Sequence, residues 1–341
     1  MNLCKDWRTI KDTMYKLKLI TTGEDLEFWK ILIENIAQNQ FVTIAHNPCL
    51  PNILAETFGF KPASYLIWND EKIIGVLPGI TIGNKFASLP HFSYGGPLCI
   101  NEHIERIKIS ELFPKQNYDI RSFHILSDFY SDEKVICYLK LQNSVDGQWN
   151  SFKSKLRSQI KKGENYGHKI LNGGIELLSD FYMVYTQNML RLGSPPLPKI
   201  LFKNILNNYK FGNVNITVVK YNNLSVASGM TLSYMGFNEV CWASSDHRYN
   251  NLNVNMVLYW EIIKKSIIDG NKIFSFGRSS KESNTLKFKL QWGTDVVPIY
   301  FNYSRSHSIS LKKMTFLSKI WSIQPNWSSK FFGKYVSKYM F

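Results

Sequence analysis

Apolar residues recur at helical spacing in several stretches of the chain. Residues 24–38 begin with acidic residues and then carry apolar side chains every three or four positions, which predicts a helix whose positive end meets negative charge. Residues 253–269 show the same spacing, and Gly270 follows as a helix stop. By the same criteria, further helices are expected over 48–59, 101–115, 149–163, 179–192 and 199–209.

Shorter runs of β-branched and aromatic residues alternate with turn-forming residues. Residues 64–90 hold several such runs, broken by Asn-Asp, Gly and Pro, which predicts an antiparallel meander. Strands are also expected over 119–127, 133–142, 214–220, 225–234, 237–244, 272–276 and 296–303. Because helices followed by a meander occur in both halves, the sequence predicts a mixed α+β fold with two β-sheets, each flanked by helices.

Length and composition allow two domains with buried cores. The chain has 341 residues, of which 44% are hydrophobic. We expect an N-terminal half over 1–150, a C-terminal half over 151–310 and a tail helix over 311–341. There is no run of 18 apolar residues, and the first residues lack the apolar core of a secretory signal, so neither a membrane span nor a signal is expected.

The five cysteines are scattered along the chain. They form no Cys-x-x-Cys motif and no pairing with histidine, which argues against a zinc site and against a disulfide framework. We therefore expect no metal and a reducing, cytoplasmic location. Cys241 could form an acyl-enzyme, but a packed apolar thiol is the preferred interpretation.

Positive charge is concentrated in two segments. The formal net charge is +15, and residues 151–172 carry six Lys/Arg against one Glu, while residues 301–341 carry seven Lys/Arg and no acid. Local basic surface favours a polyanion, a phosphorylated ligand or an acidic membrane face, although solvated lysine faces are the alternative. The aromatic and basic segment 316–341 suits a peripheral helix on an anionic membrane, or a terminal helix docked on the protein.

Five stretches in one order resemble a known family. They are SLPHFSYGGPL (88–98), LRSQIKKGENYG (156–167), FYMVYTQNMLRLGSPPLPKILF (181–202), NVNMVLYWEIIKKSIIDG (253–270) and FSFGRSSKESNTLKFKLQWGTDVVPIYFNY (274–303). Together they resemble the FemAB-related acyltransferases of the GNAT-like superfamily, in the branch found beside exosortase and exopolysaccharide genes. The resemblance covers roughly residues 25–340.

This resemblance carries implications for fold and function. It implies two tandem GNAT-like halves, each a mostly antiparallel sheet flanked by helices. Founding members move an amino acid from aminoacyl-tRNA onto a peptidoglycan precursor amine. The implied function here is an acyltransferase that transfers an N-acyl or aminoacyl group to an amino-sugar, a peptide or a lipid-linked intermediate of surface polysaccharide or cell-envelope biosynthesis. Such an enzyme is expected at the inner face of the membrane.

The resemblance also suggests where the donor binds. In a GNAT half, an R-x-x-G-x-G loop holds the coenzyme A pyrophosphate at the start of a helix. The matching pattern here is Arg248-x-x-Asn251-x-Asn253, so asparagine replaces both glycines and its side chain narrows the approach to a phosphate. Arg248, Asn251, Asn253, Gly277 and Ser279 are the expected donor-binding residues. The donor, acyl-CoA or aminoacyl-tRNA, is a co-substrate, and no tightly bound cofactor is expected.

Amide formation needs a deprotonated amine, a polarised carbonyl and a stabilised leaving group. Lys289 is the candidate that stabilises developing negative charge, and Arg278 could clamp a phosphate or carboxylate with two parallel N–H bonds. The alternatives are a solvated helix lysine and a buried ion pair. Relatives often carry Asp where this chain has Ser275, so the proton acceptor is open.

The remaining candidate residues concern the proton and the acceptor. Asp246, Glu239 and Glu261 lie in the adjacent block as possible bases, and Asp246 is grouped with the catalytic residues. His91, Tyr94 and Trp242 are the expected acceptor-binding residues, although a tight turn with a packed tyrosine explains the loop equally well. Two other functions stay open: a non-catalytic scaffold of the same fold, suggested by Ser275, and a nucleic-acid-binding module that uses residues 151–172.

Overall fold

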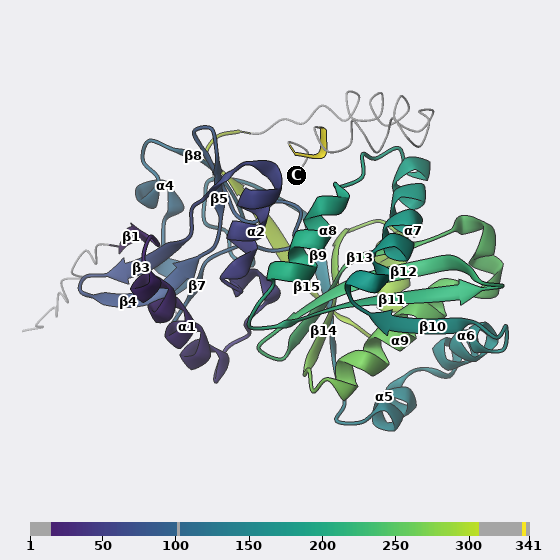
Figure 1. Cartoon of the computed structure of the whole chain (residues 1–341). Coiled ribbons are helices and arrows are strands. Elements are labelled where there is room, and N and C mark those ends of the chain that lie inside the picture. The colour runs from purple at the N-terminus through teal and green to yellow at the C-terminus, as the bar shows by residue number, and fades with distance from the viewer. Residues whose placement is uncertain (1–14, 101–102, 307–335, 339–341) are drawn as a thin grey trace, which may run out of the picture.

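A single large β-sheet runs through the molecule (Figure 1). The computed structural model describes residues 15–100, 103–306 and 336–338. Neighbouring strands pair antiparallel except for β13–β14 and β6–β8, which are parallel. The eleven strands, in spatial order, are β10 (Lys169–Gly173), β11 (Asn213–Tyr221), β12 (Leu224–Tyr234), β13 (Phe237–Ser245), β14 (Ile273–Ser280), β9 (Phe129–Lys140), β15 (Asp295–Tyr303), β8 (Asn117–Ser122), β6 (Lys85–Ala87), β5 (Ile80–Ile82) and β2 (Lys61–Pro62).

Two groups of helices cover the two faces of this sheet. One hydrophobic core lies under α1 (Gly23–Ala37), α2 (Cys49–Phe58), α7 (Leu178–Arg191) and α8 (Lys199–Asn208). The other lies under α5 (Val145–Ser151), α6 (Ser154–Glu164), α9 (Val254–Ile268) and α10 (Asn284–Leu290). Because successive side chains of a strand point to opposite faces of the sheet, one strand contributes to both cores. Val218 lies in the first core and Val219 in the second.

A smaller sheet lies beside the part of the large sheet that β8, β6 and β5 form. Its four antiparallel strands are β1 (Tyr15–Leu19), β3 (Tyr65–Asn69), β4 (Lys72–Leu77) and β7 (Leu98–Cys99). A third hydrophobic core joins this sheet to the short helices α3 (His103–Arg106) and α4 (Ile109–Leu112). The mixed α+β class predicted from the sequence is confirmed: the sheets are mostly antiparallel and helices flank them.

The two halves exchange strands instead of closing separately. β14 pairs with β9, and β15 lies between β9 and β8, so strands from both ends of the chain alternate in the middle of the sheet. The expected division at residue 150 falls inside α5. The smaller sheet lies within 1–150, but the large sheet takes strands from both ranges, 1–150 and 151–310.

Two predicted helices differ from the structure. The expected helix over 149–163 is split into α5 and α6, because Phe152 has an extended backbone and buries its ring against Trp260 and Trp292, at 5.6 Å between ring centroids in both cases. The expected helix over 101–115 is two single turns, α3 and α4, within its described part. The predicted tail helix lies outside the described residues apart from 336–338.

Membrane spans can be assessed over the part of the chain that the structure describes. No helix there combines the length and the apolar character needed to cross a bilayer.

Candidate functional site

The sheet opens into a fork where β13 and β14 stop pairing. These parallel strands pair at only three positions, the last of which is Glu239 with Ser275. β13 then continues to Ser245 beside β12, and β14 continues to Ser280 beside β9. A register shift on β14 between Ser275 and Arg278 accompanies the separation. The fork therefore places the backbone of the Ser275–Arg278 segment at an opening between two strands.

Gly277 makes this shift possible. Its φ is +67°, a conformation that residues with a side chain rarely adopt. A Cβ at this position would lie 3.2 Å from the Ser93 side-chain oxygen. Ser93 belongs to the loop 88–97 of the first half, and its hydroxyl oxygen accepts the N–H of Arg278 at 3.3 Å. Gly277 thus lets a loop from one half touch a strand from the other.

A buried carboxyl lies at the base of the fork. Glu239 is 3% exposed, and the Ser275 hydroxyl donates to its Oε2 at 2.9 Å. The Ser275 oxygen in turn accepts the N–H of Gly277 at 3.1 Å. Burial raises the pKa of Glu239, against the opposing effects of hydrogen bonds from Ser275 and Ser93 and of the charges on Lys289 and Arg278. Glu239 is therefore a proton acceptor of increased basicity.

Ser275 now has a physical explanation. An Asp at this position would put a second carboxylate against Glu239 on the paired strand, and two adjacent carboxylates cannot both stay ionised. Serine keeps one acid at the fork and orients it. The proton acceptor that Ser275 lacks is available on its partner strand.

Lys289 reaches the fork from α10. It is 3% exposed, so it is buried and not solvated. Its ammonium group donates to the carbonyl oxygens of Gly277 and Arg278, both at 2.9 Å. Burial lowers the pKa of Lys289 to about 8. These two bonds use two of its three N–H groups, so the lysine supports the bulge and still carries positive charge beside it.

Two arginines lie on the first-half side of the fork. Both lie over the ring of Phe301. The guanidinium carbon is 5.8 Å from the ring centroid for Arg278 and 5.2 Å for Arg121. Arg121 is 1% exposed and donates to the Phe92 carbonyl oxygen at 2.8 Å, while its Nε has no partner among the described residues. Burial and the nearby charge of Arg121 lower the pKa of Arg278 to about 9. Two neighbouring guanidinium groups favour an anionic ligand.

The loop 88–97 shapes this region. Gly95 and Gly96 are required because a Cβ would lie 2.7 Å from the Ser88 oxygen and 2.8 Å from the Arg121 oxygen, respectively. His91 packs on Phe58 with ring centroids 5.1 Å apart. Burial, together with the charges of Arg121 and Arg278, lowers the pKa of His91 to about 3, so the ring is neutral at physiological pH.

The other two expected acceptor residues are packed. Tyr94 is buried, donates its hydroxyl to the Pro97 oxygen at 3.2 Å and stacks on Phe123 at 4.2 Å. Trp242 is 9% exposed and packs against aromatic rings of both halves. Both side chains hold the loop in place, which is the tight-turn interpretation of this segment.

The expected donor loop connects β13 to α9 through the 3₁₀ helix η3 (His247–Leu252). Asp246 caps η3 by accepting the Arg248 N–H at 3.0 Å and also pairs with the Arg248 guanidinium. This pairing lowers the pKa of Asp246, which makes it a weaker proton acceptor than Glu239. Asp246 therefore shapes the loop between β13 and α9 and does not join Glu239 at the base of the fork.

Asn253 occupies the glycine position of the loop. Its φ is +54°, which asparagine tolerates, and it is the first residue before α9. Its side-chain amide donates to the Gln159 oxygen of α6 at 3.2 Å. The amide is thus engaged by α6. Arg248 and Asn251 are exposed on the loop, and Ser279 is buried on the β14 arm of the fork.

Sequence reasoning brought together Lys289, Arg278 and Gly277 but missed two residues of the site. Ser93 gave no signal, because nothing local marks a loop serine that contacts another half. Arg121 gave none either, since Asn117, Asp119 and Ser122 make its strand polar in any case. Among the described residues, no group of three or more potential metal ligands was found.

The fold is shared with several solved structures. FemX superposes with a TM-score of 0.56 at 11% identity, covering 88% of this chain and 99% of that chain. A tandem GNAT protein from the clavulanic acid biosynthesis pathway gives 0.52 at 8% identity, covering 86% and 100%. The C-terminal domain of a putative lysylphosphatidylglycerol synthetase from Agrobacterium fabrum gives 0.51 at 8% identity, covering 83% and 93%. No protein-family model matches the sequence, and no curated protein matches it.

Proposed function

We propose that this protein is an acyl- or aminoacyltransferase whose reaction takes place at the β13–β14 fork. The observation that carries the proposal is a buried Glu239 of raised pKa at the base of the fork, flanked by Lys289 and Arg278. The shared fold of FemX, a lysylphosphatidylglycerol synthetase domain and a tandem GNAT protein supports it. Group transfer from a carrier to an amine is the chemistry that these groups fit.

Each residue then has a defined role. The acceptor amine attacks the carbonyl carbon of the donor, and its proton passes to the Glu239 carboxylate directly or through the Ser275 hydroxyl. Lys289 and Arg278 stabilise the negative charge that develops on the carbonyl oxygen. The C–O bond of an ester donor or the C–S bond of a thioester donor breaks, and the leaving group takes up the proton. The amide bond replaces the broken bond.

The acceptor belongs to the cell envelope in this proposal. We infer an amino-sugar, peptide or lipid-linked intermediate of surface polysaccharide biosynthesis, handled at the cytoplasmic face of the membrane. The motif resemblance in residues 88–98 and 274–303 supports this class. The neighbouring guanidinium groups of Arg121 and Arg278 would suit an anionic group on such an acceptor.

Mass spectrometry tests the proposal. Surface glycans and lipid-linked intermediates would be compared between cells with the gene, cells without it and cells that carry a Glu239→Gln copy. Loss of one acyl or aminoacyl mass in the last two strains is the expected result. Identical spectra from all three strains would overturn the proposal. If the mass is lost without the gene but present with the Glu239→Gln copy, the protein would act as a scaffold.

A further inference from the structure

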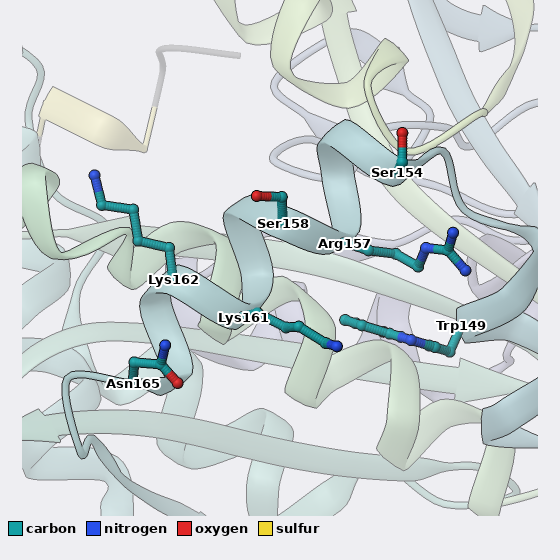
Figure 2. A pocket seen from close by; sticks show the side chains of 7 residues that line it. All are labelled: Trp149, Ser154, Arg157, Ser158, Lys161, Lys162 and Asn165. Atoms are coloured by element: carbon teal, nitrogen blue, oxygen red, sulfur yellow. The ribbon is translucent and has the colours of Figure 1, made fainter.

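A basic pocket lies along the outer face of α6, away from the fork (Figure 2). Its volume is about 530 Å³, far more than a single small anion needs. Its lining combines one aromatic ring, three cationic side chains and three small polar ones. These residues are Trp149, Ser154, Arg157, Ser158, Lys161, Lys162 and Asn165.

α6 is fixed to the donor loop by its opposite face. Gly163 packs against α9 so closely that a Cβ there would lie 2.6 Å from the Val257 Cγ2 atom and 3.2 Å from the Asn253 oxygen. The Asn253 side chain also holds the Gln159 carbonyl oxygen. The pocket is therefore on a rigid support, about one helix diameter of 10–12 Å from the first turn of α9.

The cations of this pocket are not neutralised by the protein. Among the described residues, Arg157, Lys161 and Lys162 form no ion pair, and no acidic residue lines the pocket. Figure 2 shows Arg157 and Lys161 reaching toward the Trp149 ring from α6, with the Lys161 ammonium 5.9 Å from the ring centroid. Cations without an acidic partner, gathered beside a partly exposed ring, favour a ligand with both negative charge and an aromatic face.

Trp149 is held so that it can stack. It packs on Trp260 with ring centroids 5.4 Å apart and stays partly exposed toward the pocket. A surface for a lipid headgroup would need no flat ring beside its charges, and an interfacial helix would present an apolar face, whereas the lining here is polar apart from Trp149.

We propose that this pocket binds the nucleotide end of the donor carrier, with the base on Trp149 and the phosphates on Arg157, Lys161 and Lys162. This inference rests on the proposed function. Acyl-CoA and aminoacyl-tRNA both end in an adenosine that carries phosphate, so the shared ligand chemistry is an adenosine phosphate. The carrier would then run from α6 past the donor loop to the fork.

Binding of labelled probes to the full-length protein tests the site. The probes are coenzyme A and a short single-stranded RNA that ends in CCA, each followed by fluorescence polarisation. The double variant R157A/K161A should bind the probe that the wild type binds at least about tenfold more weakly, because each charge-assisted phosphate contact is worth about a factor of ten. The control K153A/K155A removes the same charge from the N-terminal end of α6, outside the pocket lining, and should stay within about twofold of the wild type.

Two further variants separate stacking from charge. W149F keeps a ring and should retain most of the affinity, while W149A should lose about tenfold. Equal losses in both double variants would overturn the proposal in favour of general electrostatic attraction. Binding to vesicles of anionic lipid, with no binding of either nucleotide probe, would overturn it in favour of a membrane surface.

The probe that binds identifies the donor carrier. Transfer assays with the same variants distinguish this proposal from the proposed function. If only the coenzyme A probe binds, the carrier is coenzyme A, and if only the RNA probe binds, the carrier is RNA. The E239Q variant should bind the probe normally without transferring a group. Transfer by R157A/K161A with an unchanged donor KM would overturn the pocket alone, whereas probe binding by a protein that transfers nothing would count against the proposed function alone.

Discussion

Glu239 and Ser275 form the smallest unit of the site, a hydrogen-bonded pair on two strands that separate beyond it. Neither residue is informative alone. The sequence marked Ser275 as a departure from relatives and listed Glu239 as one of three possible acids, but only the register of β13 against β14 brings them together. Pairing between strands 36 residues apart cannot be derived from local patterns, so the sequence alone could not place Glu239 beside Ser275.

Replacing Glu239 by Gln should abolish the proton-accepting function while keeping the size of the side chain. We expect kcat to fall by about a hundredfold to ten-thousandfold, since this is the usual contribution of a general base. The matched control is Asp246→Asn, which changes an acid that caps η3 and should leave kcat within about threefold. Steady-state transfer assays measure both. Equal losses in the two variants would contradict the assignment of the base.

Replacing Ser275 by Asp should destabilise the protein in a pH-dependent way. The new carboxyl shares a proton with Glu239, so the pKa of the pair in the folded state lies above its value in the unfolded chain. Stability from such a raised pKa is present at low pH and is lost as the pH rises. We expect a loss of about 2 kcal/mol at pH 8 and a smaller loss at pH 5, measured by urea denaturation. A loss independent of pH would contradict this account.

At the scale of elements, α10 and β14 hold the fork open through the bulge at Gly277. The helix N-cap Ser283 starts α10 in the right place for Lys289 to reach back to two β14 carbonyl groups. The sequence predicted the strand of this unit over 272–276 and offered a solvated helix lysine as the alternative for Lys289. It did not show that the lysine is buried, because the spacing of Lys287 and Lys289 alone is typical of a solvated helix face.

Two glycines of positive φ allow a controlled test of this unit. Gly277→Ala introduces a strained conformation and a contact with Ser93, whereas Gly293→Ala introduces the strain alone, since nothing lies within 4 Å of its Cβ position. Both should lose about 1 kcal/mol from the backbone, and Gly277→Ala should lose more and also reduce transfer. Thermal unfolding and activity assays compare them. Identical behaviour of the two variants would show that the Ser93 contact has no importance.

At the scale of the whole molecule, the exchange of strands joins the halves into one sheet. Sequence periodicity predicted most of the individual strands, and the mixed class followed from their order. The position of β15 between β8 and β9 could not be predicted, because it depends on contacts between residues nearly 180 apart, such as Asn302 with Leu126. Local sequence patterns therefore predicted the individual strands, whereas long-range pairing sets their order in the sheet.

This arrangement predicts that both halves unfold together. Hydrogen exchange at increasing denaturant should give the amides of β9 and β12 the same opening free energy, because each strand lies in the interior of one continuous sheet. Mass spectrometry of peptides from the two strands measures this. Exchange of β9 at clearly lower denaturant than β12 would mean that the halves behave as separate cooperative units.

The order in which the sheet is assembled also matters while the chain is being made. Both neighbours of β9 in the sheet, β14 and β15, come from residues 273–303, so a ribosome releases β9 long before either partner exists. During that interval the apolar run 135–139 of β9 has no sheet to join, and the first half is an incomplete template. Synthesis of this protein should therefore depend on chaperones that shield residues 129–140 until the last strand emerges.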